Sequence, residues 1–447
     1  MDSGKNYLKQ TVIGTALVIA VLLALRLIPE FDIGSFHFKR IDMLADILVK
    51  EKPKDITQDT VKVVKPVYVD TCKTGITCIE DYTADSSGMR IFMAALDSSK
   101  RREVRIAWFG DSYVEGDILL DPLRDSLQAL FGGSGVGFVP ITSEVNRFRQ
   151  TITHEFKNWK TYSIVGDHSD DYPLGPAGHV FVPQDGDEVS YEGIPRRKRL
   201  SYFPSEKIYY GQAEGATLRY STGGEPVEIN LKDGNEIQQL VIDSTCRQFS
   251  LAVTGGKAVL YGADFESSRG ICVDNFSMRG NSGIGLYSVN EKMYRDFDAL
   301  HHYDLVILSY GLNVASEKAK NYYWYVKGMS KVIAMIKKAF PRSSILMIGC
   351  SDRAAKIDGD YQTMPMLKEL IDVQRQMAAD NQVCFWNIFE AMGGDSTMIN
   401  WADMPHHPLA DKDYTHLTFY GGKKVAEIFI GTLLYEKEKY DRKKKSM

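Results

Sequence analysis

Two hydrophobic patterns alternate along most of this chain. Nearly continuous apolar runs of strand length occur at 104–109, 304–309, 344–348 and 383–388. Parallel strands that are buried on both faces have this composition. Between the runs lie segments whose apolar residues recur every three or four positions, as in a helix packed by one face. The alternation predicts an α/β fold, a flavodoxin-like three-layer sandwich with a parallel sheet between two layers of helices.

The helices of this sandwich are expected at four amphipathic segments. The first, 119–131, is followed by Gly132 and Gly133, and glycine commonly ends a helix. The others are 322–340, which stops before a proline, 366–379 and 420–435.

The segment 151–276 interrupts this alternation and has a different character. It is rich in Gly, Asp and Tyr, and its apolar runs are short. Strands are expected at 216–220, 238–242, 249–253 and 257–261, with a hairpin turn at Gly255-Gly256. We expect an inserted β-sandwich-like module, which either shapes a substrate cleft or only stabilises the fold.

The N-terminus carries a candidate membrane anchor. Lys5 and Lys9 precede an apolar run at 11–25, and Arg26 follows it. The run is near the short end of the roughly 17–25 residues that span a bilayer. We expect an uncleaved transmembrane helix, with a cleaved signal peptide as the alternative. By the positive-inside rule, the helix would cross the inner (cytoplasmic) membrane once and leave the chain after Pro29 extracytoplasmic, in the periplasm.

These patterns divide the chain into six parts. In order they are a cytoplasmic tip and anchor (1–29), a polar stalk (30–86), the first part of the α/β domain (87–150), the β-rich insert (151–276), the second part of the α/β domain (277–437) and a basic tail (438–447).

The amino-acid composition is that of a globular protein and argues against nucleic-acid binding. The 447 residues are 44% hydrophobic and 25% charged, as in ordinary globular proteins, and the formal net charge is -4. A chain without an overall basic field is not expected to bind nucleic acid. Nothing in the sequence indicates an oligomeric state.

Six cysteines are compatible with an oxidising compartment. Cys72 and Cys78 lie in a polar segment where a small disulfide loop is plausible, and Cys246 with Cys272 is a candidate second pair. Cys350 and Cys384 follow or lie within apolar runs and are expected to be buried thiols. No closely spaced Cys or His couples occur in a zinc-site pattern, so no metal and no organic cofactor are expected.

Three polar motifs occur where a catalytic site is expected. Ser112 follows the first predicted strand, and Asn313 follows the second. The carboxyl ends of parallel strands form the binding edge of an open α/β sheet. Near the C-terminus, Asp413 precedes His416 by three residues, so its carboxylate can bind Nδ1 and leave Nε2 as a base toward a serine. We therefore predict a Ser112–His416–Asp413 triad, with Asn313 as a donor to an oxyanion.

The motifs resemble the four sequence blocks of the SGNH (GDSL-like) hydrolase family. The blocks are Gly110-Asp111-Ser112, the glycine-rich 279–285, Gly311-Leu312-Asn313 and Asp413-x-x-His416. The segments 105–112 and 135–138 are more narrowly similar to the branch that contains peptidoglycan O-acetylesterases, which also has a β-rich insert.

The resemblance implies a role for each block. Ser112 would be the nucleophile and would give the first oxyanion-hole amide, and Asn313 would give a side-chain donor. For the second amide, Gly283 is chosen over Gly280 because its Ser-Gly step fits the block. Tyr113 departs from the family's usual Leu, and from the His frequent in the peptidoglycan branch, so the resemblance carries over the triad but not the substrate specificity.

Several other polar and aromatic residues are expected to have structural roles. Asp111 is expected to order the turn after the first strand. His406 and His407 are expected as an exposed loop pair without a metal. Trp401 and the cluster at 322–325 are expected to pack in the core rather than to stack on sugars.

The predicted function is that of a serine esterase that removes O-acetyl groups from an extracytoplasmic polysaccharide, with peptidoglycan as the first candidate substrate. Its partners would be the acetylated glycan and the membrane. An exported polysaccharide O-acetyltransferase with the same triad is one alternative. A non-catalytic glycan-binding envelope protein is another.

Overall fold

The computed structural model describes residues 11–15, 31–33, 36–38, 72–195 and 197–446. They belong to two compact units, 1–62 and 63–447. In the first unit, 11–15 is helical, and β1 (Phe31–Ile33) pairs with β2 (Phe36–Phe38). Most of the predicted membrane anchor, and much of the predicted stalk, lie outside the described residues. No helix within the described ranges combines the length and the apolar composition that a membrane crossing requires.

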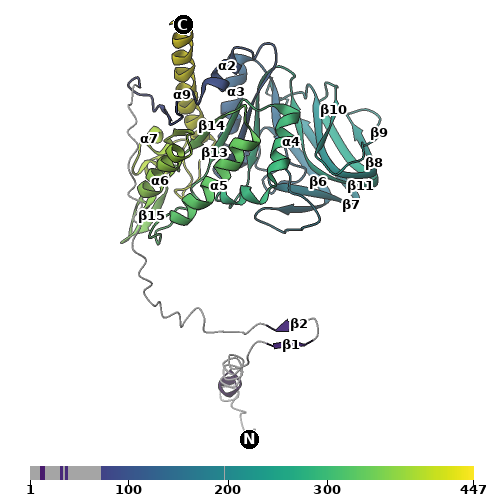
Figure 1. Cartoon of the computed structure of the whole chain (residues 1–447), viewed down its shortest axis with the longest axis horizontal. Coiled ribbons are helices and arrows are strands. Elements are labelled where there is room, and N and C mark those ends of the chain that lie inside the picture. The colour runs from purple at the N-terminus through teal and green to yellow at the C-terminus, as the bar shows by residue number, and fades with distance from the viewer. Residues whose placement is uncertain (1–10, 16–30, 34–35, 39–71, 196, 447) are drawn as a thin grey trace. The chain divides into compact units, whose positions relative to one another are not determined.

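A six-stranded sheet forms the centre of the second unit (Figure 1). Five neighbouring strands are parallel, and the last pairs antiparallel at the edge. In spatial order they are β12 (Gly270–Ser277), β4 (Glu103–Gly110), β13 (Leu305–Ser309), β14 (Ser344–Ile348), β17 (Cys384–Trp386) and β3 (Ile79–Asp81). The three longer runs predicted as buried strands are confirmed as β4, β13 and β14, and the fourth contributes the short β17.

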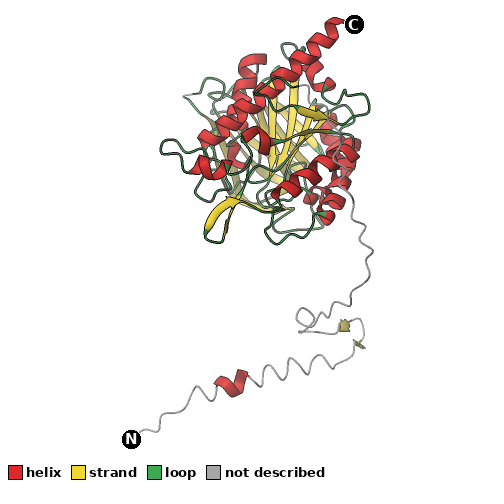
Figure 2. Ribbon diagram, turned by 90° about the vertical axis from the view of Figure 1, so that its left-hand side faces the viewer, coloured by secondary structure: helices red, strands yellow, loops and turns green. Residues whose placement is uncertain are grey.

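Helices cover this sheet on both faces, as the predicted three-layer sandwich requires (Figure 2). On one side pack α2 (Arg90–Leu96), α3 (Leu120–Phe131) and α9 (Phe419–Ser446). On the other pack α4 (Glu291–His301), α5 (Tyr323–Ala339) and α6 (Leu367–Asp380). Short helices near the carboxyl edge are η1 (Glu115–Asp117), η2 (Ile284–Ser288), α7 (Ile388–Met392) and α8 (Thr397–Ala402).

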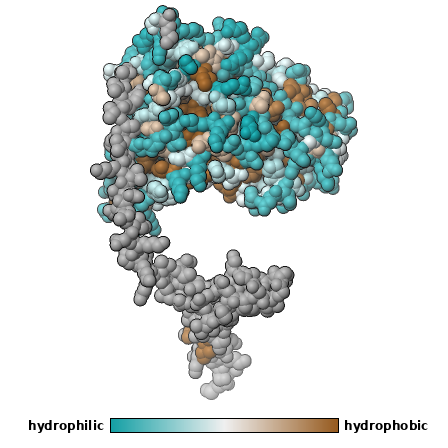
Figure 3. Space-filling view, viewed as in Figure 1, coloured by the Kyte–Doolittle hydropathy of each residue, from teal (hydrophilic) through white to brown (hydrophobic). Residues whose placement is uncertain are grey.

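Aromatic side chains fill the space between the sheet and its helices. Trp108 of β4 is fully buried and meets Phe429 of α9 edge to face, with ring centroids 5.6 Å apart. Trp386 of β17 lies against the same Phe429 ring. Burial of such rings is the dominant favourable term in folding. The surface seen in Figure 3 is correspondingly mainly hydrophilic, with scattered apolar residues.

The insert is a second, antiparallel sheet with a hydrophobic core of its own. Its strands are β5 (Gly135–Val139), β6 (Ile152–Ser163), β7 (His179–Gly193), β8 (Glu206–Ser221), β9 (Val227–Asn230), β10 (Gln238–Ile242) and β11 (Gln248–Glu266). The prediction of a β-rich module is confirmed, but hydrogen bonds connect all seven strands into one sheet instead of two. A hairpin β15 (Ala354–Ile357) and β16 (Asp360–Thr363) stands apart from both sheets.

The predicted hairpin turn at Gly255-Gly256 is wrong. Residues on both sides of the glycines belong to β11 and pair with the same strand, β8. The register shifts there, so the glycines form an irregularity within a long strand. Gly256 has φ +63° and lies against the backbone of β8, where a side chain would not fit.

Three segment boundaries also differ from expectation. β3 lies in the predicted stalk yet pairs with β17, so the central sheet begins before residue 87. β12 falls inside the predicted insert but belongs to the parallel sheet, whereas β5 precedes the predicted insert and pairs with β11. The predicted basic tail continues α9 as helix to Ser446.

One predicted disulfide is present and the other is not. Cys72 and Cys78 are bonded, with Cα atoms 5.8 Å apart. Cys246 and Cys272 are free thiols, because Cys246 lies beside Glu206 of β8 and Cys272 lies in the parallel sheet. Cys350 and Cys384 are buried and free, as expected.

A fully buried arginine joins the two sheets. Arg105 of β4 contacts Asp264 of β11 at 2.6 Å and Asp274 of β12 at 2.9 Å, and it also pairs with Glu266 of β11. Lys207 of β8 adds a second cation, 2.8 Å from Glu266. The catalytic sheet and the insert therefore share one buried ion network.

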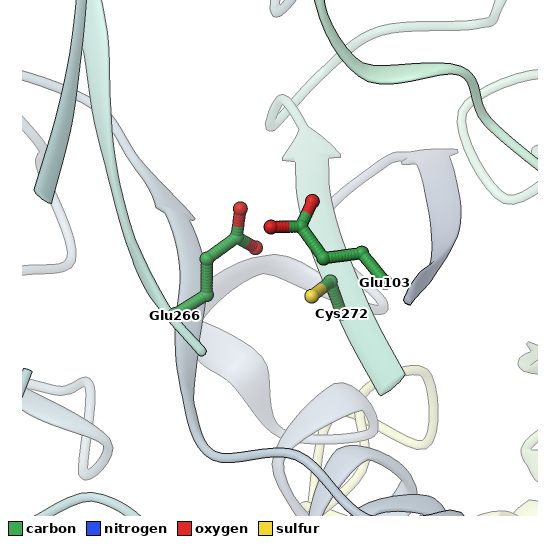
Figure 4. A group of neighbouring side chains, drawn as sticks. All are labelled: Glu103, Glu266 and Cys272. Atoms are coloured by element: carbon green, nitrogen blue, oxygen red, sulfur yellow. The ribbon is translucent and has the colours of Figure 1, made fainter. Parts of the chain in front are cut away.

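The network also holds one further carboxylate and two hydroxyl groups. Glu103 lies beside Glu266 and Cys272 (Figure 4), and Lys207 approaches it to 3.0 Å. The hydroxyl groups of Tyr209 and Tyr303 donate to Asp264 and Asp274. Burial, with the neighbouring carboxylates, holds the pKa of Asp264 well above its ordinary value. For Glu266, Arg105 and Lys207 outweigh burial and lower its pKa to about 2.

Replacing Arg105 with Met is expected to destabilise the fold by about 3–5 kcal/mol, because buried carboxylates would lose their partner. Chemical denaturation of the variant and the native protein measures this difference. Lys157→Met is the matched control, since Lys157 and Glu188 form a pair whose side chains are 61% and 51% exposed. Such surface pairs contribute at most about 1 kcal/mol. An Arg105→Met variant as stable as the control would contradict a structural role for the network.

Candidate active site

The carboxyl ends of three parallel strands meet in one row. Gly110 of β4 lies opposite Ser277 of β12 on one side and Ser309 of β13 on the other. The loop after each strand carries one predicted site segment, so residues from three distant parts of the chain converge on this edge. Met278 donates its N–H to the Gly110 carbonyl at 3.0 Å, which extends the pairing into the loops.

Ser112 stands two residues beyond β4 in a tight turn. The preceding Asp111 is buried, and its Oδ1 accepts the Tyr113 N–H at 3.0 Å, which fixes the turn as expected. Ser112 itself is half-buried, and its own N–H donates to no group among the described residues. Its hydroxyl and its amide therefore both remain available at the sheet edge.

His416 is held by the loop just before α9. A bridge between Ala410 and Leu417 closes this loop, and the Asp411 N–H donates to the His416 carbonyl at 2.8 Å. Asp413 Oδ1 accepts the backbone N–H groups of Thr415 and His416 at 2.9 and 3.0 Å. The other oxygen, Oδ2, lies 2.6 Å from His416 Nδ1.

The structure brings the three predicted triad residues together. His416 Nε2 lies 3.0 Å from Ser112 Oγ, although 304 positions separate the two in the chain. With Nδ1–H donated to Asp413, Nε2 presents its lone pair to the serine hydroxyl. The arrangement is that of a serine activated by a histidine base.

Asp413 is a negatively charged carboxylate at neutral pH. Partial burial acts to raise its pKa, but the hydrogen bonds from the His416 ring and from the N–H groups of His416 and Thr415 outweigh that effect. The pKa of Asp413 is therefore lowered from its ordinary value. A negative charge at this position favours the imidazolium that forms when His416 accepts a proton.

Burial acts differently on Asp111. It raises the pKa of this carboxyl to about 6, while the Tyr113 N–H and the charge of His416 lower it and Glu115 raises it. Asp111 consequently changes its charge near neutral pH, at the base of the nucleophile turn.

Asn313 lies at the same edge and is exposed. Its Nδ2 donates to the Asn281 carbonyl at 3.1 Å, which places the amide against the glycine-rich loop after β12. An amide nitrogen carries two hydrogens, so one remains free to donate to a ligand.

The choice of Gly283 as an oxyanion-hole amide is not supported by the geometry. Gly283 is buried, and its N–H donates to Asn281 Oδ1 at 2.8 Å inside the loop. A donor that is already used to shape the loop is not free for a substrate. Gly280 in the same loop is exposed, has φ +75°, and its N–H finds no acceptor in the part of the chain that the structure describes.

A buried aspartate near the nucleophile was not predicted as a site residue. Asp117 of η1 receives hydrogen bonds from Arg124, Arg149, Thr151 and Asn275, the shortest at 2.7 Å. Burial acts to raise its pKa, but the two arginines outweigh it, so the pKa lies far below its ordinary value. Asp117 thereby ties the nucleophile loop to the start of the insert and to β12. Only its position five residues after Ser112 could have pointed to it.

The other histidines and aromatic residues singled out in the sequence differ in how far they are buried. His406 and His407 are exposed, and the His407 ring lies 4.4 Å from that of Tyr420. Trp401 is partly buried. The expectation of core packing at 322–325 holds for Tyr322 and Tyr325, but Tyr323 and Trp324 are 63% and 55% exposed.

Clusters of acidic residues that resemble a cation site occur in the described chain only around Arg105. Their oxygens already bind the Arg105 guanidinium and the Lys207 ammonium. These two positive charges oppose a metal ion at the same position. The cluster is therefore an ion-pair network between the sheets.

Comparison with known proteins shows a solved structure with a similar fold. No family model and no curated protein matches the sequence. Among solved structures, a peptidoglycan O-acetylesterase is similar with a TM-score of 0.67 and 22% identity, over 81% of this chain and 99% of that chain.

Two other solved structures are similar over less of the fold. An acetyl xylan esterase covers 36% of this chain and 80% of its own, at 19% identity and a TM-score of 0.28. A family two carbohydrate esterase from Cellvibrio japonicus covers 52% and 88%, at 11% identity and a TM-score of 0.20. TM-scores this low do not establish a shared fold over the whole chain. This chain shares its fold with the peptidoglycan O-acetylesterase.

Proposed function

We propose that this chain is a serine esterase that removes O-acetyl groups from an extracytoplasmic polysaccharide, with peptidoglycan as the first candidate. One observation carries the proposal: the continuous hydrogen-bond chain from Ser112 through His416 to Asp413. A serine, an imidazole and a carboxylate in this order form an activated nucleophile for acyl transfer.

In the first half-reaction, Ser112 Oγ attacks the acetyl carbonyl carbon while His416 Nε2 accepts the hydroxyl proton. The tetrahedral intermediate then breaks its bond to the sugar oxygen, and His416 returns the proton to that oxygen. The products are the free sugar hydroxyl and an acetyl ester on Ser112. Asp413 stabilises the imidazolium between these two proton transfers.

In the second half-reaction, water takes the place of the sugar. His416 accepts a proton from the water as its oxygen attacks the acetyl carbonyl. The intermediate breaks its bond to Ser112 Oγ, and His416 reprotonates the serine. Acetate is released, and none of these steps requires a group from outside the chain other than water.

The oxyanion of each intermediate needs donors at the same edge of the sheet. We assign this role to the Ser112 N–H, the free Asn313 amide hydrogen and the Gly280 N–H. Gly280 replaces Gly283 in this role because its N–H is exposed and unused, whereas the Gly283 N–H is bonded to Asn281. Asn313 binds the carbonyl of Asn281, the residue after Gly280, so the two donors belong to one connected loop pair.

The proposed substrate rests on two supports. The fold is shared over 81% of this chain with a structure described as a peptidoglycan O-acetylesterase. The sequence blocks resemble the same branch.

Action outside the cytoplasm is supported by the Cys72–Cys78 disulfide, since disulfides persist in oxidising compartments. The Lys5 and Lys9 flank of the apolar run supports an N-terminal membrane anchor.

Replacing Ser112 with Ala is expected to lower kcat for 4-nitrophenyl acetate by at least about a thousandfold, because no acetyl-enzyme can form. Initial rates of nitrophenol release measure the change. Ser201→Ala, in an exposed loop of the insert, is the matched control and keeps full activity. Undiminished hydrolysis by the Ser112 variant would remove the proposed nucleophile.

Product analysis and active-site labelling of the same enzyme preparation distinguish hydrolysis from acetyl transfer and from glycan binding without catalysis. With O-acetylated peptidoglycan, an esterase releases acetate, whereas a transferase yields acetylated acceptor glycan. A glycan-binding protein without activity would not react with an active-site serine reagent. Release of acetate from O-acetylated peptidoglycan by the native protein, and not by the Ser112 variant, is the expected result.

Asn313→Ala is expected to lower kcat by roughly a hundredfold to a thousandfold with little change in KM, because an oxyanion donor acts mainly in the transition state. Steady-state kinetics on 4-nitrophenyl acetate give both constants. Asn321→Ala is the matched control, because Asn321 lies in the same connection between β13 and α5 but outside the site. A rise in KM with an unchanged kcat would show that Asn313 only binds substrate.

Asp111→Asn is expected to change the pH dependence of kcat/KM. Asp111, with its pKa raised to about 6, is neutral below that pH and charged above it. A negative Asp111 should stabilise the positive charge that develops on the imidazole in the transition state, so the native enzyme should exceed the variant severalfold at pH 8 and match it near pH 5. Circular dichroism at both pH values controls for folding. A ratio of native to variant kcat/KM that is constant across this range would contradict the coupling.

A further inference from the structure

An exposed aromatic pair lies beside the triad and has no role in the mechanism above. The ring of Tyr361, in β16, lies 4.3 Å from the ring of Tyr414, with an angle of 45° between their planes. Tyr361 is 47% exposed and Tyr414 is partly buried. Tyr414 stands between Asp413 and His416 in the chain, so the pair lies directly against the loop that carries the proposed base.

The β15–β16 hairpin that carries Tyr361 is attached to two loops of the site. The Ala354 N–H donates to the Tyr414 carbonyl at 3.0 Å, in the Asp413–His416 loop. Arg353 donates from its guanidinium to the Leu312 carbonyl at 2.9 Å, next to Asn313. The hairpin is therefore fixed relative to both the base and the oxyanion donor.

The hairpin also has a rigid tip. Its two strands pair from Ala354 with Thr363 to Ile357 with Asp360. Asp358 and Gly359 connect them, and both have positive φ, at 53° and 100°. Two positive φ values in a two-residue loop are typical of a type I′ turn, which matches the twist of the flanking strands. Tyr361 is therefore presented from a defined surface rather than from a loose loop.

The backbone at Tyr414 supports a functional reason for its side chain. Its φ is +53°, in the left-handed region that bulky residues rarely adopt. The turn itself requires this conformation, since it lets Asp413 accept two backbone N–H groups. Glycine or asparagine would meet that requirement with less strain. A tyrosine at this position instead contributes a ring that faces Tyr361 at the surface.

The chemistry of the pair suits a sugar ring. A pyranose has an apolar face of C–H groups and a rim of hydroxyls, and tyrosine has an apolar ring with a hydroxyl at its tip. Neither phenol hydroxyl has a hydrogen-bond partner among the residues that the structure describes, so both are free to bind sugar hydroxyls. The neighbouring positions Asp360 and Gln362 are exposed and polar.

We propose that Tyr361 and Tyr414 form a carbohydrate subsite that binds the sugar ring adjoining the acetylated one. The enzyme would then recognise a glycan chain rather than a single acetylated sugar. This inference rests on the proposed esterase function and specifies its substrate as an oligosaccharide or polymer. Tyr361 has no contact with the reacting atoms in this arrangement and acts in binding alone.

Kinetics on a small and a large substrate test the proposal. Tyr361→Ala should lower kcat/KM about tenfold on O-acetylated chitotetraose or O-acetylated xylotetraose, through KM. It should leave kcat/KM on 4-nitrophenyl acetate within about twofold of the native value, because that substrate does not reach the subsite. Tyr202→Ala, at an exposed tyrosine of the insert, is the matched control and should change neither.

Two outcomes would overturn the subsite. An equal loss on both kinds of substrate would show that Tyr361 only positions the His416 loop. Unchanged kinetics on both oligosaccharides would show that it binds no sugar. Tyr361→Phe should retain most of the activity that Ala loses, because the stacking face is kept.

A binding measurement separates this inference from the proposed function. Calorimetric titration of Ser112→Ala with unacetylated chitotetraose and xylotetraose should show weaker binding after the further Tyr361→Ala change. If the native protein hydrolyses no acetate ester, the esterase proposal fails, and the titration still tests the subsite. Equal affinity, or no measurable affinity, in the Ser112→Ala protein with and without Tyr361 would overturn the subsite alone.

Discussion

The arrangement of the site depends on the common register of three parallel strands. β4 pairs with β12 and β13 so that Gly110, Ser277 and Ser309 lie in one row across the sheet. Parallel pairing allows the chain to return to the same edge after each crossover, and that edge is where open α/β sheets bind ligands. A register shift of one residue in either pair would reverse which side chains face the site. The positions of Ser112, Gly280 and Asn313 all follow from this row.

The insert is tied to both ends of β4. At the start of the strand, Arg105 binds Asp264 of the insert and Asp274 of β12. Beyond its end, Asp117 binds Arg149 and Thr151, which lead into β6. The two centres have opposite central charges. Carboxylates of β11 and β12 surround Arg105, whereas Arg124 of α3 and Arg149 surround Asp117. The insert is thus part of the framework that orients the turn carrying Ser112.

Most of the central sheet and the triad could be predicted from the sequence because their signals are local. Apolar runs mark β4, β13 and β14, and each site motif stands directly after a strand or before α9. β12 was missed because Asp274 interrupts its apolar run, and its burial depends on Arg105, 169 residues away. The choice between Gly280 and Gly283 likewise has no local signal in the sequence. It depends on the Asn281 side chain, whose orientation within the loop has no sequence pattern.

The Arg105 network also has a consequence for the order of folding. The guanidinium lies in the first long strand of the catalytic sheet, but the carboxylate of Glu266 that pairs with it follows 161 residues later. During synthesis, Arg105 would have only the partly exposed Glu103 of its own strand as a carboxylate partner until β11 and β12 had emerged. The catalytic half and the insert are therefore expected to complete their folding together. The nucleophile strand would be held in place only when nearly two thirds of the chain is available.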